Sequence, residues 1–378
     1  MRVLIDYRPA LRERSGVGEY THQLARALLA AFPVGSRDRP LELTLFSSSW
    51  KDRLTLAPEL AGAAAVDRRI PVSLLNLAWH RAGWPAVETL TARRFDVTHS
   101  LHPLLLPARD AAQVVTIHDL NFLTHPERTQ SEIRRDYPSL ARTHARRADA
   151  VIVVSHFTAR EVERHFELPP DRISVCPPGA PAWEPRTAPP PDGGYVLFFG
   201  TLEPRKNVGG LLDAYELLLA RRRDLPPLLL AGKATGAARP WLERIERAPL
   251  RGAVRHAGYV DPANRYTLYA GARVLVQPSF EEGFGLPVLE AMTVGLPIVA
   301  TNRGSLPEIL DGAGSLVEPD EPAEMAAAIE RMIDDEAFAA ASAAKSVQRA
   351  AHFNWPRTAQ AVYDTYQQAI EHRRCASG

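Results

Sequence analysis

The sequence has few of the residues that build disulfide frameworks and thiolate metal sites. Its 378 residues include only two cysteines, Cys176 and Cys375, and the second lies close to the end of the chain. Two cysteines exclude a multi-disulfide scaffold and a four-cysteine zinc site, and they fit a reducing compartment. We therefore expect a cytoplasmic protein without stabilising cross-links.

Long apolar runs and the common metal and phosphate motifs are also missing. No run approaches the roughly 18 apolar residues of a membrane-spanning helix, and Met1–Asp6 is typical of a buried strand rather than a signal peptide. The sequence contains no Asp-x-Asp, no His-Glu-x-x-His and no Gly-x-x-x-x-Gly-Lys-Ser/Thr. These absences argue against a bound divalent metal and P-loop phosphoryl transfer. We expect no metal or other cofactor, and only peripheral contact with any membrane.

Charge of one sign is not in large excess. The formal charge is +1 at pH 7, which gives no reason to expect nucleic acid as a partner. Residues 1–190 are the more basic part, with 25 Lys and Arg against 21 Asp and Glu. Much of this excess lies within 128–164, at arginines 128, 134, 135, 142, 146 and 147. That run is either a solvated helix face or a contact with an anionic membrane surface or a phosphorylated acceptor.

A second feature of the first half bears on the membrane alternative. Pro71–Pro85 carries five large apolar side chains, Leu74, Leu75, Leu77, Trp79 and Trp84. We favour packed core or a domain interface for this stretch. It is nevertheless the strongest lipid-facing element that the first half offers.

Short buried strands alternate with amphipathic helices along the chain. Strands are predicted at 2–6, 41–46, 96–100, 114–118 and 150–155, and then at 195–200, 227–232, 254–258, 274–277, 297–301 and 315–318. A proline- and glycine-rich linker at 177–194 separates the two series. This pattern predicts an α/β protein with two Rossmann-like, doubly wound domains, 1–190 and 191–354, facing each other across a cleft.

The most informative stretch is Pro278–Glu290, a glycine loop between a predicted strand and a predicted helix. Gly283 and Gly285 permit a tight turn, and the helix N-terminus behind them directs backbone N–H groups toward an anion such as a phosphate. Glu282 and Glu290 flank the loop and suit hydroxyl groups instead. A nucleotide sugar offers both kinds of group.

Two cations follow the first strand of the second domain. Arg205 and Lys206 lie between the strand at 195–200 and the next helix, at the same edge of the sheet as the glycine loop. Such a pair can bind a diphosphate and stabilise the negative charge that grows on it as a bond breaks. The alternative, a solvated pair, places two cations unfavourably at a helix N-terminus.

Two further motifs lie in the first domain. His118 and Asp119 end the strand at 114–118, where a histidine is either structural or catalytic. Gly16 and Gly18 precede a helix at 21–32, but Thr21 occupies the third glycine position of a dinucleotide fingerprint. This second motif alone indicates no more than a strand–helix turn.

Together these stretches resemble the retaining nucleotide-sugar glycosyltransferases of family four, whose fold is called GT-B. The resemblance is carried by 282–300, 200–207, 116–119 and 15–18, in the family's order and over essentially the whole chain. Adjacent Arg205 and Lys206 resemble the bacterial mannosyltransferase-like branch, where other members often carry Arg-x-x-x-Lys. The resemblance also implies that a C-terminal helix at about 355–373 crosses back onto the N-terminal, acceptor-binding domain.

The resemblance assigns roles to individual residues. The implied catalytic residues are Glu282, Lys206, Arg205 and His118, with Glu282 on hydroxyls of the transferred sugar. The implied donor-binding residues are Gly16, Gly18, Asp119, Lys233, Tyr259, Val260, Gly283, Phe284, Gly285, Leu286 and Glu290. Among these, Glu290 would bind the ribose hydroxyls, the amides around Phe284 would hold the sugar or its phosphate, and Lys233 and Tyr259–Val260 would lie near the base.

The implied activity is transfer of a hexosyl group, first of all mannosyl from GDP-mannose, to a glycan or lipid-linked acceptor in polysaccharide or lipopolysaccharide synthesis. No carboxylate can be assigned as a nucleophile, so we favour front-face substitution over double displacement. A UDP-hexose or a deoxysugar nucleotide remains open as donor. The alternatives are a sugar-nucleotide epimerase or a phosphorylase of the same fold, and a non-catalytic nucleotide-sugar-binding homologue.

Overall fold

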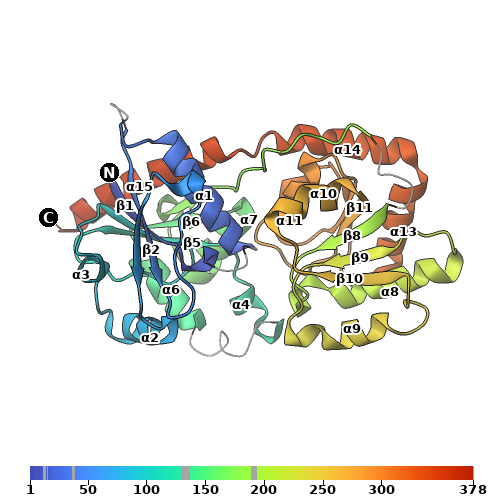
Figure 1. Ribbon diagram of the computed structural model, residues 1–378, viewed down its shortest axis with the longest axis horizontal. Helices are drawn as coiled ribbons and strands as arrows, with labels where there is room; N and C mark the ends of the chain where they lie inside the picture. Colours follow the sequence, from blue (N-terminus) through green and yellow to red (C-terminus); the bar gives the residue numbers. More distant parts are fainter. Residues whose placement is uncertain (12–13, 15, 36–38, 129–136, 189–193, 378) are drawn as a thin grey trace. The chain divides into compact units, whose positions relative to one another are not determined.

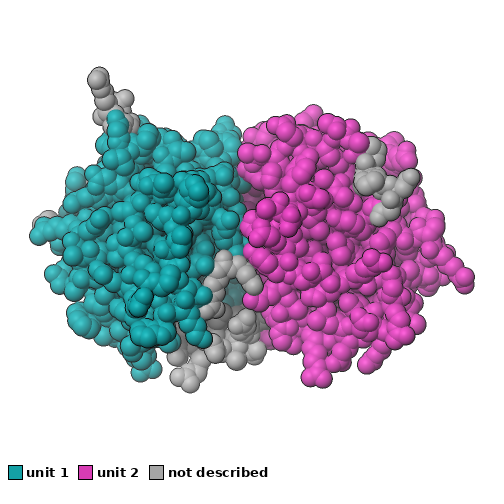
Figure 2. All heavy atoms as spheres, viewed as in Figure 1, with its two compact units in different colours: residues 1–123, 131–179, 354–378 teal, residues 124–130, 180–353 magenta. Residues whose placement is uncertain are grey.

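The structure is a computed structural model that describes residues 1–11, 14, 16–35, 39–128, 137–188 and 194–377. The chain forms two compact units, coloured separately in Figure 2. Unit 1 comprises 1–123, 131–179 and 354–378, and unit 2 comprises 124–130 and 180–353. Arg134 and Arg135 of the basic run, Ser15 and the predicted boundary at 190 lie outside the described residues.

The described part of unit 1 is built on a seven-stranded parallel sheet (Figure 1). Its strands are β1 (Arg2–Asp6), β2 (Glu42–Ser48), β3 (Ala64–Arg68), β4 (Val97–Ser100), β5 (Ala112–Ile117), β6 (Ala150–Val153) and β7 (Ile173–Val175). They lie in the order β3-β2-β1-β4-β5-β6-β7, so the direction of winding reverses between β1 and β4. Strands β4, β5 and β6 are buried along their whole length, as expected for a sheet covered on both faces.

Helices cover both faces of this sheet. They are α1 (Val17–Ala31), α2 (Val72–Ala82), α3 (Val87–Thr91), α4 (Asn121–Thr124), α6 (Tyr137–Arg147), α7 (His156–Phe166) and α15 (Trp355–Ser377). The last of these returns from the end of the chain and packs against α1, β5 and β6. The Tyr363 ring stacks on Phe32 at 4.2 Å, and the Tyr366 hydroxyl hydrogen-bonds Nδ1 of His99 at 2.7 Å. These contacts explain why 354–378 belongs to unit 1.

Unit 2 repeats the architecture with six parallel strands among its described residues. They are β8 (Tyr195–Phe199), β9 (Leu228–Ala231), β10 (Val254–Gly258), β11 (Ala272–Gln277), β12 (Ile298–Thr301) and β13 (Ser315–Val317), in the order β10-β9-β8-β11-β12-β13. The winding reverses between β8 and β11. The helices are α8 (Val208–Arg221), α9 (Arg239–Ile245), α10 (Arg265–Ala270), α11 (Leu286–Thr293), α12 (Leu306–Leu310), α13 (Pro322–Asp334) and α14 (Glu336–Ala350).

The two doubly wound units agree with the predicted fold class, and the differences lie at the edges. Strands β3 and β7 were not predicted, because both are short edge strands with partly exposed side chains and no continuous apolar run. Helix α1 begins at Val17 rather than at Thr21. The division between the units falls at 179/180, ahead of the predicted one, because Arg186 already donates to the carbonyl groups of Val294 and Ala272 in unit 2.

The two stretches considered for membrane contact, Pro71–Pro85 and the basic run, contain exposed side chains. Within Pro71–Pro85, Leu75 and Trp79 are buried, but Leu74, Leu77 and Trp84 are more than half exposed. The stretch is therefore packed core only in part, and its alternative role as a domain interface stays a prediction. Of the basic run, Arg142, Arg146 and Arg147 face solvent on α6, and Arg146 pairs with Glu167. No helix within the described ranges has the length and apolar character needed to span a membrane.

Candidate functional site

The reversal of winding in unit 2 brings the predicted cations and carboxylate together. Arg205 and Lys206 lie in the short turn after β8, and Glu282 follows the adjacent strand β11. The Lys206 ammonium donates to Oε1 of Glu282, and Nη1 of Arg205 lies 3.4 Å from Oε2. Lys206 and Glu282 are 6% and 5% exposed, so this is a buried ion pair at the carboxyl edge of the sheet. Ligands of doubly wound sheets bind at this kind of position.

The Glu282 carboxylate is held by more than its cations. Its Oε1 also accepts hydrogen bonds from Nε2 of Gln277 at 2.7 Å and from Oγ of Ser279 at 2.6 Å. Burial alone would raise the pKa of Glu282, but the charges of Lys206 and Arg205 outweigh it and hold the pKa at about 2. Glu282 is therefore an ionised, fixed acceptor whose Oε2 is the less occupied oxygen.

The cations keep donors that Glu282 does not use. Burial and the charge of Arg205 lower the pKa of Lys206, and Glu282 opposes that shift. Of the three donors of the Lys206 ammonium, the contact with Glu282 accounts for one. Nε of Arg205 pairs with Glu203 at 2.6 Å. The cluster is thus charge-balanced, and the Lys206 ammonium has further N–H groups to offer an incoming anion.

The predicted glycine loop leads directly into α11. Gly283, Phe284 and Gly285 are buried, and Gly285 caps the helix with φ of +92°. The positive φ of Gly285 favours glycine at this position, and a Cβ atom there would lie 2.8 Å from the Leu306 side chain, which would have to shift. Leu286 opens the helix, whose first N–H groups lie beside Glu282 in the sequence and suit an anion.

A second loop fixes the backbone of Glu282. The Ser305 N–H and Oγ donate to the Glu282 carbonyl oxygen at 3.0 and 3.1 Å. Gly304, at φ of +62°, lies so close that an added Cβ atom would be 2.4 Å from that oxygen. Neither residue was predicted from the sequence, because the contact joins two loops that follow different strands.

Replacing Gly304 by alanine is expected to destabilise unit 2 and to lower activity. The matched control is Gly312→Ala, since Gly312 also has positive φ, +79°, but no atom lies within 4 Å of its added Cβ. Both changes carry the backbone cost of about 1–2 kcal/mol, and only Gly304→Ala adds the collision with Glu282. In thermal unfolding, the melting temperature should fall further for Gly304→Ala than for Gly312→Ala. Equal decreases would contradict the inferred close approach.

Glu290 is buried on α11 and is bound by two side chains that were not predicted. Nη1 of Arg265 donates to Oε1 of Glu290 at 3.1 Å, and the Tyr269 hydroxyl donates to Oε2 at 2.7 Å. Arg265 is 5% exposed and lies 5.7 Å over the Phe199 ring. Both partners come from α10, about 20 residues earlier in the chain, where the helical pattern alone gave no functional signal. Glu290 is thus a fixed carboxylate.

The residues predicted near the base lie on the other side of β8. Lys233 follows β9 and is exposed, and Tyr259 and Val260 follow the edge strand β10, with Tyr259 38% exposed. A Cβ atom at Gly232 would lie 2.0 Å from the Gly200 carbonyl oxygen, so the ends of β8 and β9 approach closely.

In unit 1 the two predicted glycines have different roles. Gly16 caps α1 with φ of +51°, and no atom lies within 4 Å of an added Cβ. Gly18 is on α1, where an added Cβ would lie 2.6 Å from the Pro9 carbonyl oxygen. Glycine is therefore favoured at position 18 because the backbone of Pro9 leaves no room for a side chain. At position 16 it is favoured because of the positive φ.

His118 and Asp119 follow β5 in unit 1. Nε2 of His118 donates to the Leu101 carbonyl oxygen at 3.2 Å, and the ring meets Tyr20 edge-on at 5.0 Å. Burial lowers the pKa of His118 to about 4, although Asp119 opposes the shift. The imidazole is therefore neutral at pH 7, with its proton on Nε2 and an acceptor at Nδ1. The Asp119 carboxylate caps the N–H of Asn121 at 3.2 Å.

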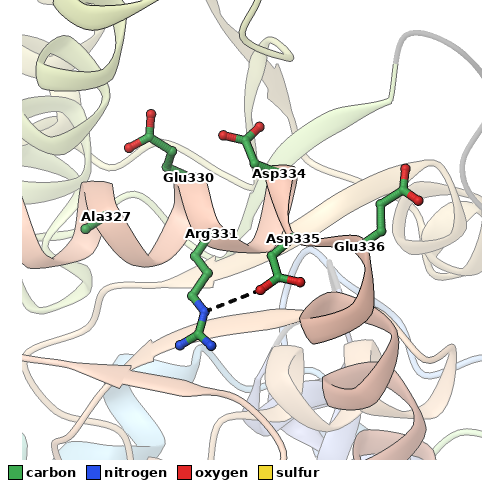
Figure 3. A pocket seen from close by; sticks show the side chains of 6 residues that line it. All are labelled: Ala327, Glu330, Arg331, Asp334, Asp335 and Glu336. Carbon is green, nitrogen blue, oxygen red and sulfur yellow. Dashed lines mark ion pairs between the residues drawn. The ribbon is translucent and has the colours of Figure 1, made fainter.

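A hollow elsewhere on unit 2 includes none of the predicted residues. It lies at the C-terminal end of α13 and is lined by Ala327, Glu330, Arg331, Asp334, Asp335 and Glu336 (Figure 3). Its side chains project from the helix surface, and Nε of Arg331 lies 3.9 Å from Asp335. We place the functional site at the strand ends instead. Across the described parts of the chain, no three His, Cys, Asp or Glu side chains gather as metal ligands.

Two family models match the chain, one in each half. The model described as "Glycosyltransferase Family 4" matches residues 14–182, and the model described as "Glycosyl transferases group 1" matches residues 193–335. The second match contains Arg205, Lys206, Glu282 and Glu290.

Known proteins resemble the chain over nearly its full length. O-antigen chain mannosyltransferase B of Escherichia coli is 29% identical over 393 residues, which cover 97% of this chain and 99% of that protein. Sucrose-phosphate synthase from Thermosynechococcus elongatus has a TM-score of 0.77 at 22% identity, covering 100% of this chain and 99% of that one. HepE from Anabaena in complex with UDP-glucose has a TM-score of 0.68 at 20% identity, covering 100% of both. These two structural matches confirm the predicted GT-B fold.

Proposed function

Because this chain belongs to glycosyltransferase family 4 and is a hexosyltransferase, we propose that it transfers a mannosyl group from GDP-mannose. The acceptor is a glycan or a lipid-linked glycan in polysaccharide or lipopolysaccharide synthesis. The observation that carries the mannosyl assignment is the similarity to an O-antigen chain mannosyltransferase over 97% of the chain. The buried Lys206–Glu282 pair at the strand ends of unit 2 supports catalysis rather than binding alone.

The site in unit 2 suits a nucleoside diphosphate sugar. Lys206, Arg205 and the N-terminus of α11 offer N–H donors to the two phosphates. Glu290 offers carboxylate oxygens to the ribose hydroxyls, and Oε2 of Glu282 offers an acceptor to a hydroxyl of the transferred sugar. A relative of the same fold carries UDP-glucose, which supports this class of donor.

The proposed reaction retains the configuration at the anomeric carbon. The bond from that carbon to the diphosphate oxygen breaks, and the bond to the acceptor oxygen forms on the same face. The acceptor proton passes to the departing phosphate, while Lys206 and Arg205 stabilise the charge on the diphosphate. Lys233, Tyr259 and Val260 are assigned to the base, and neutral His118 to a hydroxyl of the substrate through Nδ1.

A donor panel tests the proposal. The protein is incubated with GDP-mannose, UDP-glucose and UDP-galactose, with and without a mannose-terminated oligosaccharide, and nucleoside diphosphate release is measured. We expect release with GDP-mannose that increases with the acceptor and persists in EDTA, together with an α-linked product. Release of a free monosaccharide without acceptor would favour an epimerase, and a requirement for phosphate would favour a phosphorylase. Turnover of UDP-glucose alone would overturn the mannosyl assignment.

We also propose that unit 1 rests on the cytoplasmic face of a membrane through one side of α2. Val72, Leu74 and Leu77 are exposed on this helix, and Trp84 follows it with 65% of its surface exposed. Exposed arginines accompany them at positions 68, 69 and 81. Apolar side chains next to cations are the pattern of an interfacial helix on anionic lipid.

Replacing Leu74 and Leu77 together by serine is expected to weaken binding to phosphatidylglycerol-containing vesicles at least about tenfold, because the apolar area available for burial is lost. The matched control replaces Leu217 and Leu316 by serine; both are 38% exposed and lie in unit 2. Cosedimentation measures the bound fraction, with phosphatidylcholine vesicles showing the contribution of charge. Unchanged binding by the α2 variant, or no binding by the wild type, would contradict the membrane proposal.

A further inference from the structure

Unit 1 has its own reversal of winding, and polar side chains gather there. The order β3-β2-β1-β4-β5-β6-β7 changes direction between β1 and β4. Asp6 is the last residue of β1, and His102 lies just beyond the end of β4. In unit 2 the equivalent position, between β8 and β11, holds Lys206 and Glu282. A ligand site is expected at such a position in each doubly wound sheet.

A buried ion pair between Asp6 and Arg8 lies at this position. Asp6 is fully buried, and Arg8 donates to both of its oxygens, from Nε at 2.8 Å and from Nη2 at 2.6 Å. The third side of the guanidinium is occupied as well, since Nη1 donates to Asn76 at 2.9 Å and the group lies 4.9 Å over the Trp79 ring. The Asp6–Arg8 pair is therefore held rigidly and carries no net charge.

Three histidines lie close to one another at this position: His80 on α2, His102 after β4 and His144 on α6. We call them the histidine cluster. Nε2 of His102 lies 3.3 Å from Asp6, and the rings of His80 and His144 are 6.1 Å apart. His80 and Asn76 are half-buried and the His102 side chain is 27% exposed, whereas His144 is buried. The first three side chains can touch a ligand, and His144 supports them.

Hydrogen bonds make two of these imidazoles neutral donors. The Leu104 N–H donates to Nδ1 of His102 at 3.2 Å, and the Leu105 N–H donates to Nδ1 of His144 at 2.9 Å. A nitrogen that accepts carries no proton, so each ring bears its hydrogen on Nε2. Burial, reinforced by neighbouring positive groups, also lowers the pKa of His80 and His144 to about 4. The cluster is thus rich in donors and acceptors but uncharged at neutral pH.

We propose that Asn76 and the histidine cluster form a subsite for the hydroxyl groups of an uncharged glycan acceptor. An anionic ligand would meet no excess of positive charge, because Asp6 balances Arg8 and the histidines are neutral. Sugar hydroxyls both donate and accept, as the amide and imidazoles do. The proposal rests on the proposed glycosyl transfer for its ligand class, and all its residues belong to unit 1.

Binding without turnover gives the first test. The affinity of the wild type for methyl α-mannoside and a mannobiose is measured by saturation-transfer NMR and compared with that of His80→Ala. Loss of one hydrogen-bonding side chain should raise Kd about 3–10-fold, and His80→Gln should recover part of the loss. The control is His165→Ala, a partly exposed histidine of α7 in the same unit. Thermal unfolding checks that each variant is folded.

The possible outcomes distinguish a failure of the proposed subsite from a failure of the proposed glycosyl transfer. A mannobiose Kd that is the same in His80→Ala and wild type, or no mannobiose binding by the wild type, would overturn the subsite. Tighter binding of mannose 6-phosphate than of methyl α-mannoside would overturn its uncharged class. In kinetics, His80→Ala should raise the acceptor KM while the GDP-mannose KM changes less than about twofold. If mannobiose binding depends on His80 but no nucleotide sugar is turned over, the proposed function fails and the subsite stands.

Discussion

Replacing Lys206 by alanine is expected to lower kcat by about 10²–10³-fold, the loss found when one pre-positioned donor to a developing oxyanion is removed. Lys206 is 6% exposed and fixed by Glu282, so its charge acts in a site from which water is largely excluded. The KM for the nucleotide sugar should rise less than kcat falls, because the interaction strengthens as the leaving group gains charge. Steady-state kinetics with GDP-mannose measures both quantities.

A matched control separates chemistry from unfolding. Lys345 is an exposed lysine on α14 of the same unit, and Lys345→Ala should leave kcat within about twofold of wild type. Small alkylamines should restore part of the turnover of Lys206→Ala if the lost ammonium acts on the diphosphate. Near-normal kcat in a folded Lys206→Ala protein would remove Lys206 from the proposed mechanism.

The fold could be predicted because the sequence signals for it are local. Buried parallel strands are short apolar runs, and each one predicted in unit 2 is present with ends shifted by no more than a few residues. The edge strands β3 and β7 were missed because their side chains are partly exposed and neither contains a continuous apolar run. The meeting of Lys206 with Glu282 followed from topology, as both residues come directly after neighbouring parallel strands.

The partners of the site residues were harder to predict. Gln277 and Ser279 lie within five residues of Glu282, so their hydrogen bonds to it could have been considered from spacing alone. Arg265 and Gly304 reach Glu290 and Glu282 only through the folded arrangement of separate loops and helices. No periodicity or motif encodes such a contact. The same applies to the histidine cluster, whose three members come from three different elements of unit 1.

Replacing Glu282 by glutamine is expected to destabilise unit 2 by about 3–5 kcal/mol at pH 7, because it leaves the buried Lys206 ammonium without its counter-charge. Glutamine keeps the shape of the side chain, so the change isolates the charge from the packing. Glu203→Gln is the control, since Glu203 pairs with Arg205 in a more exposed position and such pairs contribute about 0–1 kcal/mol. Urea unfolding followed by circular dichroism measures the free energies.

The free energy of unfolding that Glu282→Gln removes should depend on pH in a defined direction. The pKa of Glu282 is lowered in the folded protein from its usual 4.5 to about 2, so its stabilising effect is complete above pH 4.5 and is lost as the pH falls toward 2. The difference in unfolding free energy between wild type and Glu282→Gln should therefore be largest at pH 5–7 and shrink through pH 4 and 3. A difference that grows in acid, or none at pH 7, would show that the Glu282 carboxylate is not held ionised by Lys206 and Arg205. The same variant should also lose most of its turnover, since Glu282 both positions Lys206 and offers Oε2 to the transferred sugar.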